Sequence, residues 1–257
     1  MELFDLSGRV AIITGSTKGI GKAIAARMCQ HGAKVVISSR KADACEAVTA
    51  EINRDFAANG GEAISIPAHV GIEDELRNLV DKTLDKWGKI TTLVPNAAAN
   101  PYYGPSAEMP DSAFEKIWEV NVKSVFKLCH MVLPGMVEAG SGSITIIASN
   151  SGLKGSVELC GYAISKVAEH QLALNLAVEY GPKGIRVNAI APGLIKTDFA
   201  KTLWTNPKRL ARVENLIPLR RIGDPHEIAG TAVFLASDAA AFLTGQVLNV
   251  DGGNAVV

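Results

Sequence analysis

Short, uninterrupted apolar runs alternate along the chain with longer segments of helical periodicity, and this alternation constrains the fold more than any other feature. Runs such as Val-Ala-Ile-Ile at 10–13 and Ile-Thr-Ile-Ile at 144–147 have no polar face, which indicates strands buried on both sides. Helical segments between such strands give right-handed crossovers. The sequence therefore predicts an α/β fold: a single-domain, Rossmann-type, doubly wound parallel sheet of about seven strands with helices on both faces.

The pattern also predicts where each element lies. The expected strands are residues 10–14, 34–38, 62–67, 92–95, 143–148, 185–190 and 246–249. The expected helices are residues 19–31, 42–58, 73–87, 111–137, 158–181 and 225–237. No linker or repeat interrupts the pattern, so residues 1–257 are expected to form one domain. Residues 196–222 fit no crossover helix, and we expect them to form a substrate lid inserted above the carboxyl ends of the strands, where such sheets bind ligands.

Charge and cysteine usage exclude several classes of protein. The 26 basic and 26 acidic residues balance, which leaves no electrostatic footprint for nucleic acid or an anionic membrane surface. The longest uncharged stretch, residues 90–107, contains three prolines, so no membrane span is expected. No secretory signal opens the chain, and the four cysteines are scattered, which is typical of a reducing compartment such as the cytoplasm. The histidines and cysteines show no metal-ligand spacing, so no metal site is expected.

A glycine-rich turn follows the first predicted strand and leads into a helix. Glycines in this context permit a tight turn and the close approach of a pyrophosphate to the helix N-terminus, where free N–H groups favour anions. The G-x3-G-x-G spacing is not the common G-x-G-x-x-G, but the strand–turn–helix context favours dinucleotide binding over a merely structural turn. The candidate cofactor-binding residues here are Gly15, Ser16, Thr17, Lys18, Gly19, Ile20 and Gly21.

The end of the second predicted strand indicates which dinucleotide binds. An NAD site usually places an acidic residue there for the ribose 2′-OH, whereas this chain has Ser39, Arg40 and Lys41. Arg40 can bond a 2′-phosphate in bidentate fashion, and Lys18 points at the same region. At roughly 1.5–3 kcal/mol for each charge-assisted bond, the two favour NADP(H) over NAD(H) by about a hundredfold or more. The alternative is that Arg40 and Lys41 only begin a solvated helix.

Tyr162 and Lys166 stand four residues apart at the start of a predicted helix, so their side chains share one face. A free tyrosine has a pKa near 10 and is a poor acid–base catalyst at neutral pH. A lysine ammonium one turn away stabilises the phenolate, and a cationic nicotinamide adds to this effect. The pair can therefore supply a tyrosine that donates a proton to a nascent alkoxide or accepts one from an alcohol.

Three further polar residues are candidates for catalysis. Ser149 ends the strand before this helix, where a hydroxyl can donate a hydrogen bond to a carbonyl oxygen that is gaining charge, and Ser151 is a weaker candidate for the same role. Asn121 lies within a long helical pattern, and asparagine there indicates a local bulge or a polar task. The candidate walls of a substrate pocket are Tyr102, Tyr103, Ser151, Leu153, Phe199, Leu203 and Trp204.

Together these motifs resemble a known family. Thr-Gly-x3-Gly-x-Gly, Asn-Ala-Ala at 96–98, Asn121, Ser149, Tyr-x3-Lys and Pro192-Gly193 follow one another in the order typical of the short-chain dehydrogenases/reductases. The resemblance covers essentially the whole chain, and residues 96–104 and 191–197 look closest to the NADPH-dependent carbonyl and retinol reductase branch and its bacterial relatives.

The resemblance implies a role for each matching residue. Tyr162 would be the acid–base, Lys166 would lower its pKa and hold the nicotinamide ribose, Ser149 would polarise the substrate oxygen, and Asn121 would anchor a water in a proton relay. Further cofactor contacts implied by the resemblance involve His69, Val70, Asn96, Ala97, Ala98, Pro192, Gly193, Ile195 and Thr197. It also implies a homotetramer in which helices 111–137 and 158–181 pack across a two-fold interface.

The chain departs from the family pattern at two places. Pro95-Asn96-Ala97-Ala98 stands where the family often has Asn-Asn-Ala-Gly, and a proline at a strand end is expected to have a small effect. His69-Val70 stands where the family commonly has Asp-Val, with the acid on the adenine amine. A histidine could stack on adenine or bond to it, or only the backbone could make that contact.

The residues and the resemblance lead to one functional expectation. The chain is expected to be an NADP(H)-dependent oxidoreductase that interconverts a ketone or aldehyde and an alcohol, with a small or medium hydrophobic molecule as its substrate. The alternatives are an NAD-dependent secondary-alcohol dehydrogenase and a reductase of 3-oxoacyl thioesters, which would need basic residues such as Lys201 and Lys208 at the mouth. A catalytically silent NADP-binding scaffold is a remote alternative.

Overall fold

The computed structural model describes residues 2–256. The fold is centred on one seven-stranded sheet in which every neighbouring pair of strands is parallel. The strand order is β3-β2-β1-β4-β5-β6-β7. The strands are β1 (Val10–Thr14), β2 (Lys34–Ser38), β3 (Glu62–Ser65), β4 (Thr92–Val94), β5 (Gly142–Ile147), β6 (Ile185–Pro192) and β7 (Val247–Val250). The predicted doubly wound parallel sheet is confirmed.

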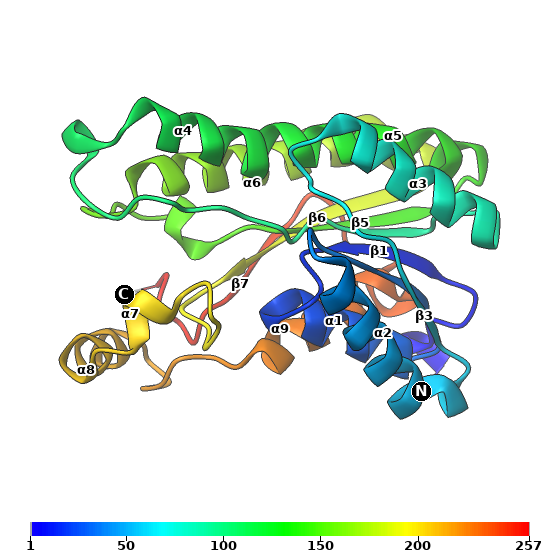
Figure 1. Cartoon of the computed structure of the whole chain (residues 1–257), viewed down its shortest axis with the longest axis horizontal. Coiled ribbons are helices and arrows are strands. Elements are labelled where there is room, and N and C mark those ends of the chain that lie inside the picture. Colours follow the sequence, from blue (N-terminus) through cyan, green and yellow to red (C-terminus); the bar gives the residue numbers. More distant parts are fainter. Residues whose placement is uncertain (1, 257) are drawn as a thin grey trace.

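Helices cover both faces of the sheet (Figure 1). They are α1 (Gly19–Gln30), α2 (Ala42–Phe56), α3 (Glu73–Trp87), α4 (Asp111–Ile117), α5 (Ser124–Glu138), α6 (Cys160–Tyr180), α7 (Lys201–Trp204), α8 (Pro207–Leu216) and α9 (Pro225–Ala236). One apolar cluster joins α1, α2 and α9 to the sheet, and a second joins α3, α5 and α6 to its other face. The fully buried strands β1 and β5 explain why their sequences are continuously apolar.

The predicted and observed boundaries differ at a few ends. β3 stops at Ser65 instead of Pro67, and β6 continues to Pro192 because that residue pairs with Val250 of β7. The single predicted helix 111–137 is three elements, since a π-helical turn, η4 (Trp118–Lys123), separates α4 from α5. The remaining helices match within a few residues.

The order of the strands determines where ligands can bind. The chain leaves β3 at one edge and continues with β4 on the other side of β1, so the winding direction reverses between β1 and β4. In open α/β sheets, ligands bind beyond the carboxyl ends of the strands at such a reversal. The loops after β1, β2, β4, β5 and β6 all leave from this end.

Residues 196–222, here called the lid, contain α7 and α8 and lie beyond the carboxyl end of β6 (Figure 1). Ile195 and Gly223 form an isolated parallel bridge at its base. The N–H of Lys196 donates to the carbonyl of Gly223 at 2.9 Å, and the N–H of Gly223 donates to the carbonyl of Leu194 at 2.9 Å. The two ends of the lid are therefore held side by side.

No helix within residues 2–256 combines the length and the apolar character that crossing a membrane requires. All four cysteines carry free thiols, and Cys29, Cys45 and Cys129 are buried. Burial raises the pKa of Cys29 to about 11 and that of Cys129 to about 12, so these thiols behave as small apolar side chains.

Candidate active site

Two backbone conformations and one close contact shape the glycine-rich turn between β1 and α1. Gly15 and Gly19 have φ values of +66° and +56°, which residues with side chains rarely adopt. At Gly21 an added Cβ would lie 2.5 Å from Nδ2 of Asn96, so only glycine fits. α1 starts at Gly19 with no side-chain cap and no acidic residue in its first turn. Its free N–H groups and dipole therefore fit a diphosphate, as dinucleotide binding requires.

Buried hydrogen bonds fasten this turn to the neighbouring strands. The hydroxyl of Ser16 donates to the carbonyl of Ile13 at 2.7 Å and accepts from the N–H of Ser38 at 2.9 Å. On the other side, Nδ2 of Asn96 donates to the carbonyl of Thr14 at 2.8 Å. The Ser16 side chain is fully buried, so it supports the turn and does not face a ligand. The side chains of Thr17 and Ile20 are half-buried.

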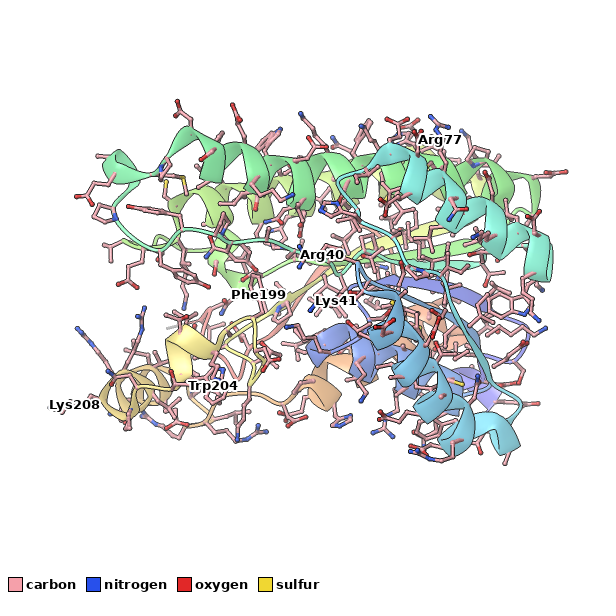
Figure 2. All side chains as sticks on the ribbon, in the orientation of Figure 1. Arg40, Lys41, Arg77, Phe199, Trp204 and Lys208 are labelled. Carbon is pink, nitrogen blue, oxygen red and sulfur yellow. The ribbon has the colours of Figure 1, made fainter. Side chains whose placement is uncertain are left out.

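The three predicted cations have different surroundings. Arg40 and Lys41 are exposed where β2 passes into α2 (Figure 2), beside the half-buried Ser39. Within residues 2–256, neither takes part in an ion pair. Nζ of Lys18 instead lies 3.5 Å from a carboxylate oxygen of Asp198, so it is directed at the lid. Of the three cations, Arg40 and Lys41 are thus the two whose charge no carboxylate within residues 2–256 offsets.

The two departures from the family pattern are accommodated within local structure. Pro95 follows the last residue of β4, and its carbonyl still accepts from the N–H of Ile147 at 2.9 Å, although the proline has no N–H to donate to the sheet. Ala97 and Ala98, which follow, are half-buried. The ring Nδ1 of His69 accepts from the N–H of Gly71 at 3.1 Å, so the histidine is engaged in its own turn.

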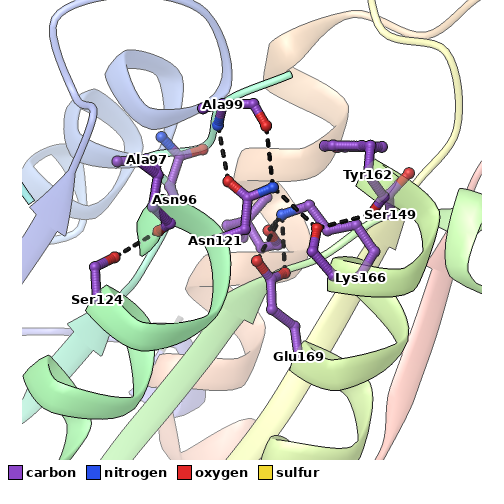
Figure 3. A network of polar contacts seen from close by, with 12 residues as sticks. Asn96, Ala97, Ala99, Asn121, Ser124, Ser149, Tyr162, Lys166 and Glu169 are labelled. Carbon is purple, nitrogen blue, oxygen red and sulfur yellow. Dashed lines mark hydrogen bonds and ion pairs between the residues drawn. The ribbon is translucent and has the colours of Figure 1, made fainter. Parts of the chain in front are cut away.

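Asn121 lies in the π-helical turn η4 and is fully buried. Its Oδ1 accepts from the N–H of Ala99 at 2.8 Å, while its Nδ2 donates to the carbonyl of Ala99 at 3.1 Å and to Oγ of Ser165 at 3.0 Å (Figure 3). The side chain therefore ties the segment after β4 to α6. An asparagine within a helix indicates either a local distortion or a polar role. Asn121 has both, because it lies in a π-helical turn and its side chain makes three hydrogen bonds.

Ser149 and Tyr162 meet at the carboxyl end of β5. Ser149 follows β5 and is 8% exposed, and its Oγ accepts from the N–H of Ser151 and donates to Oγ of Ser151, both at 3.1 Å. Tyr162 lies in the first turn of α6, and Ser149 is within hydrogen-bonding reach of its hydroxyl. Tyr162, Ser149 and Lys166 therefore converge on one place (Figure 3).

Lys166 lies beneath the tyrosine and is paired with a carboxylate. Its Nζ is 5.4 Å from the centroid of the Tyr162 ring. The same Nζ donates to the carbonyl of Ile147 at 3.1 Å and lies 2.8 Å from both Oε1 and Oε2 of Glu169. The side chains of Lys166 and Glu169 are 1% and 2% exposed, so the ion pair is shielded from water.

These contacts set the acidities of the three groups. Burial raises the pKa of Tyr162, and Lys166 and the hydrogen bond with Ser149 act against this rise. Burial lowers the pKa of Lys166, but the Glu169 carboxylate and the Tyr162 phenol together outweigh burial, and the pKa is raised overall. Burial also raises the pKa of Glu169 to about 7, against the lowering effect of Lys166. The ammonium of Lys166 therefore persists at neutral pH.

The loop after β6 lies against the glycine-rich turn. A Cβ added at Gly193 would be 2.7 Å from Cβ of Asp251, so Gly193, next to Pro192, sits where two backbones come close. Ile195 is buried at the base of the lid. A Cβ at Gly19 would lie 3.2 Å from Cγ2 of Thr197. The predicted diphosphate-binding and nicotinamide-binding segments are therefore neighbours.

The lid approaches the tyrosine. The rings of Phe199 and Tyr162 lie 6.0 Å apart at an interplanar angle of 44°. α8 is held to the segment before α6 by an ion pair between Arg209 and Glu158. Leu153, which follows the Ser149 turn, is 46% exposed and Phe199 is 44% exposed. Phe199 thus brings an exposed apolar ring close to Tyr162, and Leu153 is a second exposed apolar side chain, near the Ser149 turn.

The other predicted wall residues have different surroundings. Nε1 of Trp204 donates to the carbonyl of Thr197 at 3.0 Å, which makes Trp204 part of the internal packing of the lid, next to the half-buried Leu203. The hydroxyl of Tyr102 donates to the carbonyl of Pro105 at 2.9 Å and so is engaged in its own loop. Its neighbour Tyr103 is close enough to Tyr162 to raise the pKa of that phenol.

Sequence reasoning missed Glu169. A single glutamate within a helix is usually solvated, and the i,i+3 spacing from Lys166 was the one available signal that it lies on the face of Tyr162 and Lys166. A cavity of about 410 Å³ lined by Leu194, Ile195 and Asp251 has neither Tyr162 nor Ser149 in its wall. Across residues 2–256, no group of three or more His, Cys, Asp and Glu side chains is arranged to hold a metal ion.

Known proteins resemble this chain over nearly its full length. The family model described as Enoyl-(Acyl carrier protein) reductase matches residues 15–255. Dehydrogenase/reductase SDR family member 4 of Sus scrofa is 39% identical over 253 residues, which cover 97% of this chain and 88% of the relative.

Two solved structures have the same fold. A 7α-hydroxysteroid dehydrogenase complexed with NADH and 7-oxo glycochenodeoxycholic acid superposes with a TM-score of 0.91 at 38% identity, covering 98% of this chain and 96% of its own. A gluconate 5-dehydrogenase from Burkholderia cenocepacia J2315, in complex with NADP and tartrate, superposes with a TM-score of 0.92 at 30% identity, covering 100% of this chain and 98% of its own.

Proposed function

Because this chain belongs to the short-chain dehydrogenase/reductase family and is therefore a nicotinamide-dependent oxidoreductase, we propose that it uses NADP(H) to interconvert a ketone or aldehyde and an alcohol. The observation that carries the proposal is the convergence of Tyr162, Ser149 and Lys166 at the carboxyl end of the sheet, beside the glycine-rich turn. The presence of all three residues argues against a scaffold that binds NADP without catalysing a reaction, because such a protein would not need these contacts.

Each residue has a role that its surroundings support. In reduction, the hydroxyl of Tyr162 donates its proton to the substrate oxygen as charge builds on it; in oxidation, the phenolate accepts the proton of the alcohol. The hydroxyl of Ser149 donates to the same oxygen. The ammonium of Lys166 favours the phenolate from below the ring. Asn121 fixes the segment after β4 against α6. The nicotinamide supplies the hydride when it is bound.

The preference for NADP(H) rests on residues at the end of β2. The exposed Arg40 and Lys41 carry no ion partner among residues 2–256, and no acidic side chain stands at positions 38–41 to accept a ribose 2′-OH. The two solved neighbours described above were obtained with NADH and with NADP, so the choice depends on this chain's own side chains.

The substrate class follows from the apolar walls of the site. The exposed ring of Phe199 lies beside Tyr162, and the exposed side chain of Leu153 follows the Ser149 turn; these apolar groups support a small or medium hydrophobic substrate. Lys208, one of two basic residues that a thioester reductase could use at its mouth, lies at the outer end of α8 (Figure 2). A carbonyl or alcohol without a charged carrier is therefore the favoured substrate.

The proposal includes organisation and location. Residues 1–257 act as one catalytic domain with residues 196–222 as its lid. α5 and α6 pack across a two-fold interface in a homotetramer. The protein works in the cytoplasm, where NADPH and reduced thiols coexist.

Replacement of Tyr162 by phenylalanine tests the mechanism. Tyr162→Phe removes the proton donor and keeps the ring, so NADPH binding measured by fluorescence should stay within about twofold, whereas turnover should fall by at least about a hundredfold. Turnover is followed at 340 nm with a panel of ketones, aldehydes and alcohols and with both cofactors. Tyr180→Phe, on the far end of α6, is the matched control and should keep full activity. A fully active Tyr162→Phe would refute the mechanism.

A further inference from the structure

The mechanism described above leaves one buried charged group without a task. Glu169 is 2% exposed and lies on α6, three residues after Lys166. Burying a carboxylate costs free energy unless it is paired, and both of its oxygens contact the Lys166 ammonium at 2.8 Å. A leucine or alanine would fill a helix face against a sheet without that cost. The carboxylate at this position therefore needs an explanation.

Glu169 holds the ammonium in one place. Lysine has three N–H donors, and those of Lys166 are directed to the carbonyl of Ile147 and to the two oxygens of Glu169. All three acceptors are buried, so the flexible side chain is fixed with Nζ 5.4 Å from the centre of the Tyr162 ring. The fixed ammonium thus lies close to both the Tyr162 ring and the Glu169 carboxylate.

The other titratable groups around the pair are few. Cys129 of α5 faces Glu169, and burial raises its pKa to about 12, so it stays neutral. His170 of α6 is nearly buried, and burial with the nearby Lys166 lowers its pKa, which keeps it neutral as well. Tyr103 faces Tyr162 from the loop after β4. From β5, the group that reaches the pair is the Ile147 carbonyl. Above about pH 7, where Glu169 is ionised, Lys166 and Glu169 are therefore the charged side chains of residues 2–256 that lie around Tyr162.

Building on the proposed function, we propose that Glu169 is a positioning residue that fixes the Lys166 ammonium under Tyr162 and partly cancels its charge, so that alcohol oxidation needs a higher pH than Lys166 alone would require. The sign follows from Coulomb's law, because a negative charge disfavours a second negative charge on the phenol. In agreement, Glu169 contributes to raising the pKa of Tyr162. The pair favours reduction, in which the tyrosine must carry its proton.

The glutamine variant tests this inference because it keeps the shape and removes the charge. In Glu169→Gln, the acid limb of the pH profile of kcat/KM for alcohol oxidation should move about one pH unit lower. The limb is measured with the most active alcohol of the panel. Glu179→Gln, an exposed position on the same helix, should leave the limb where it is. Glu169→Asp keeps the charge and should return the limb toward that of the unmodified protein.

A second readout needs no turnover. Ionisation of Tyr162 is followed by absorbance at 295 nm, as the difference between the protein and its Tyr162→Phe variant. Removal of the charge at position 169 should shift this titration to lower pH by the same amount. An unshifted titration in a folded Glu169→Gln protein overturns the role of Glu169. If the titration shifts but Tyr162→Phe remains fully active, the inference about Glu169 stands and the proposed catalytic role of Tyr162 falls.

Discussion

At the scale of single residues, sequence spacing identified candidate site residues well. It was a poorer guide to the contacts that these side chains make. Tyr162 and Lys166 were found because an i,i+4 pair shares a helix face, and the structure brings both to Ser149. Ser16 belongs to the same glycine-rich turn, yet its hydroxyl bonds to β1 and β2. Glu169 could not be recognised because burial depends on the packing of α6 against the sheet, which one sequence does not reveal.

Arg40 carries the prediction at this scale. Arg40→Asp replaces a donor for a 2′-phosphate by an acceptor for a 2′-hydroxyl, so the ratio of kcat/KM for NADP to that for NAD should fall by about a hundredfold or more. Initial rates with both cofactors measure this ratio. Arg77→Asp, an exposed arginine on α3 (Figure 2), is the control and should leave the ratio unchanged. An unchanged ratio in Arg40→Asp would contradict the proposed preference.

At the scale of elements, the apolar runs predicted which segments form strands. The exact ends of each strand depend on its hydrogen-bond partners in the sheet. β5 begins at Gly142 because that residue pairs with Ile185, a neighbour that lies 43 positions later in the chain by numbering. The π-helical turn η4 has no periodic signature, since its extra residue shifts the helix face only locally. Asn121 was the one hint of it.

The prediction at this scale concerns the start of α9 and its contribution to stability. Asp224 and Glu227 form a capping box, and Glu227 also bonds to Arg221. The side-chain hydrogen bond from Arg221, helped by the N–H of Asp224, lowers the pKa of Glu227 to about 2 from its ordinary 4.5. The carboxylate therefore stabilises the fold fully above about pH 4.5, and this contribution is lost as pH falls toward 2.

Glu227→Gln should accordingly destabilise the protein by less than about 1 kcal/mol at pH 7, because the pair is partly exposed, and by progressively less at acid pH. Urea unfolding at pH 7, 5 and 3.5 measures the difference. Glu46→Gln, exposed on α2, should change stability at none of these values. A Glu227→Gln cost that grows on acidification would show that the assigned sign is wrong.

At the scale of the whole molecule, the fold class was predictable because continuous apolar strands between helices leave few alternatives. The oligomeric state, in contrast, could be predicted only from the resemblance to the family. α5 and α6 carry apolar side chains open to solvent in the single chain, including Phe126 at 50% and Val178 at 80% exposure. Large apolar side chains that stay exposed on two neighbouring helices can mark an interaction surface. They support the proposed packing of these helices between subunits.

Val178→Glu tests that packing. A charge buried between two copies is costly, so the variant should run as a smaller species than the unmodified protein in light scattering, with an unchanged circular dichroism spectrum. Asn78→Glu adds the same charge to an exposed site on α3 and should leave the mass unchanged. If Val178→Glu keeps the mass of the unmodified protein, α6 is not part of the interface.

The bridge between Ile195 and Gly223 has a consequence for how such a protein can diversify. Since the lid departs and returns at adjacent points, a loop of different length could replace its outer part, beyond Thr197 and Asp198, without moving β6 or α9. The residues proposed to select the nucleotide follow β1 and β2, whereas the lid follows β6, which is separated from β1 by β4 and β5. Selection for a new substrate can therefore act on the outer lid while Arg40 and Lys41, proposed to select the nucleotide, stay unchanged.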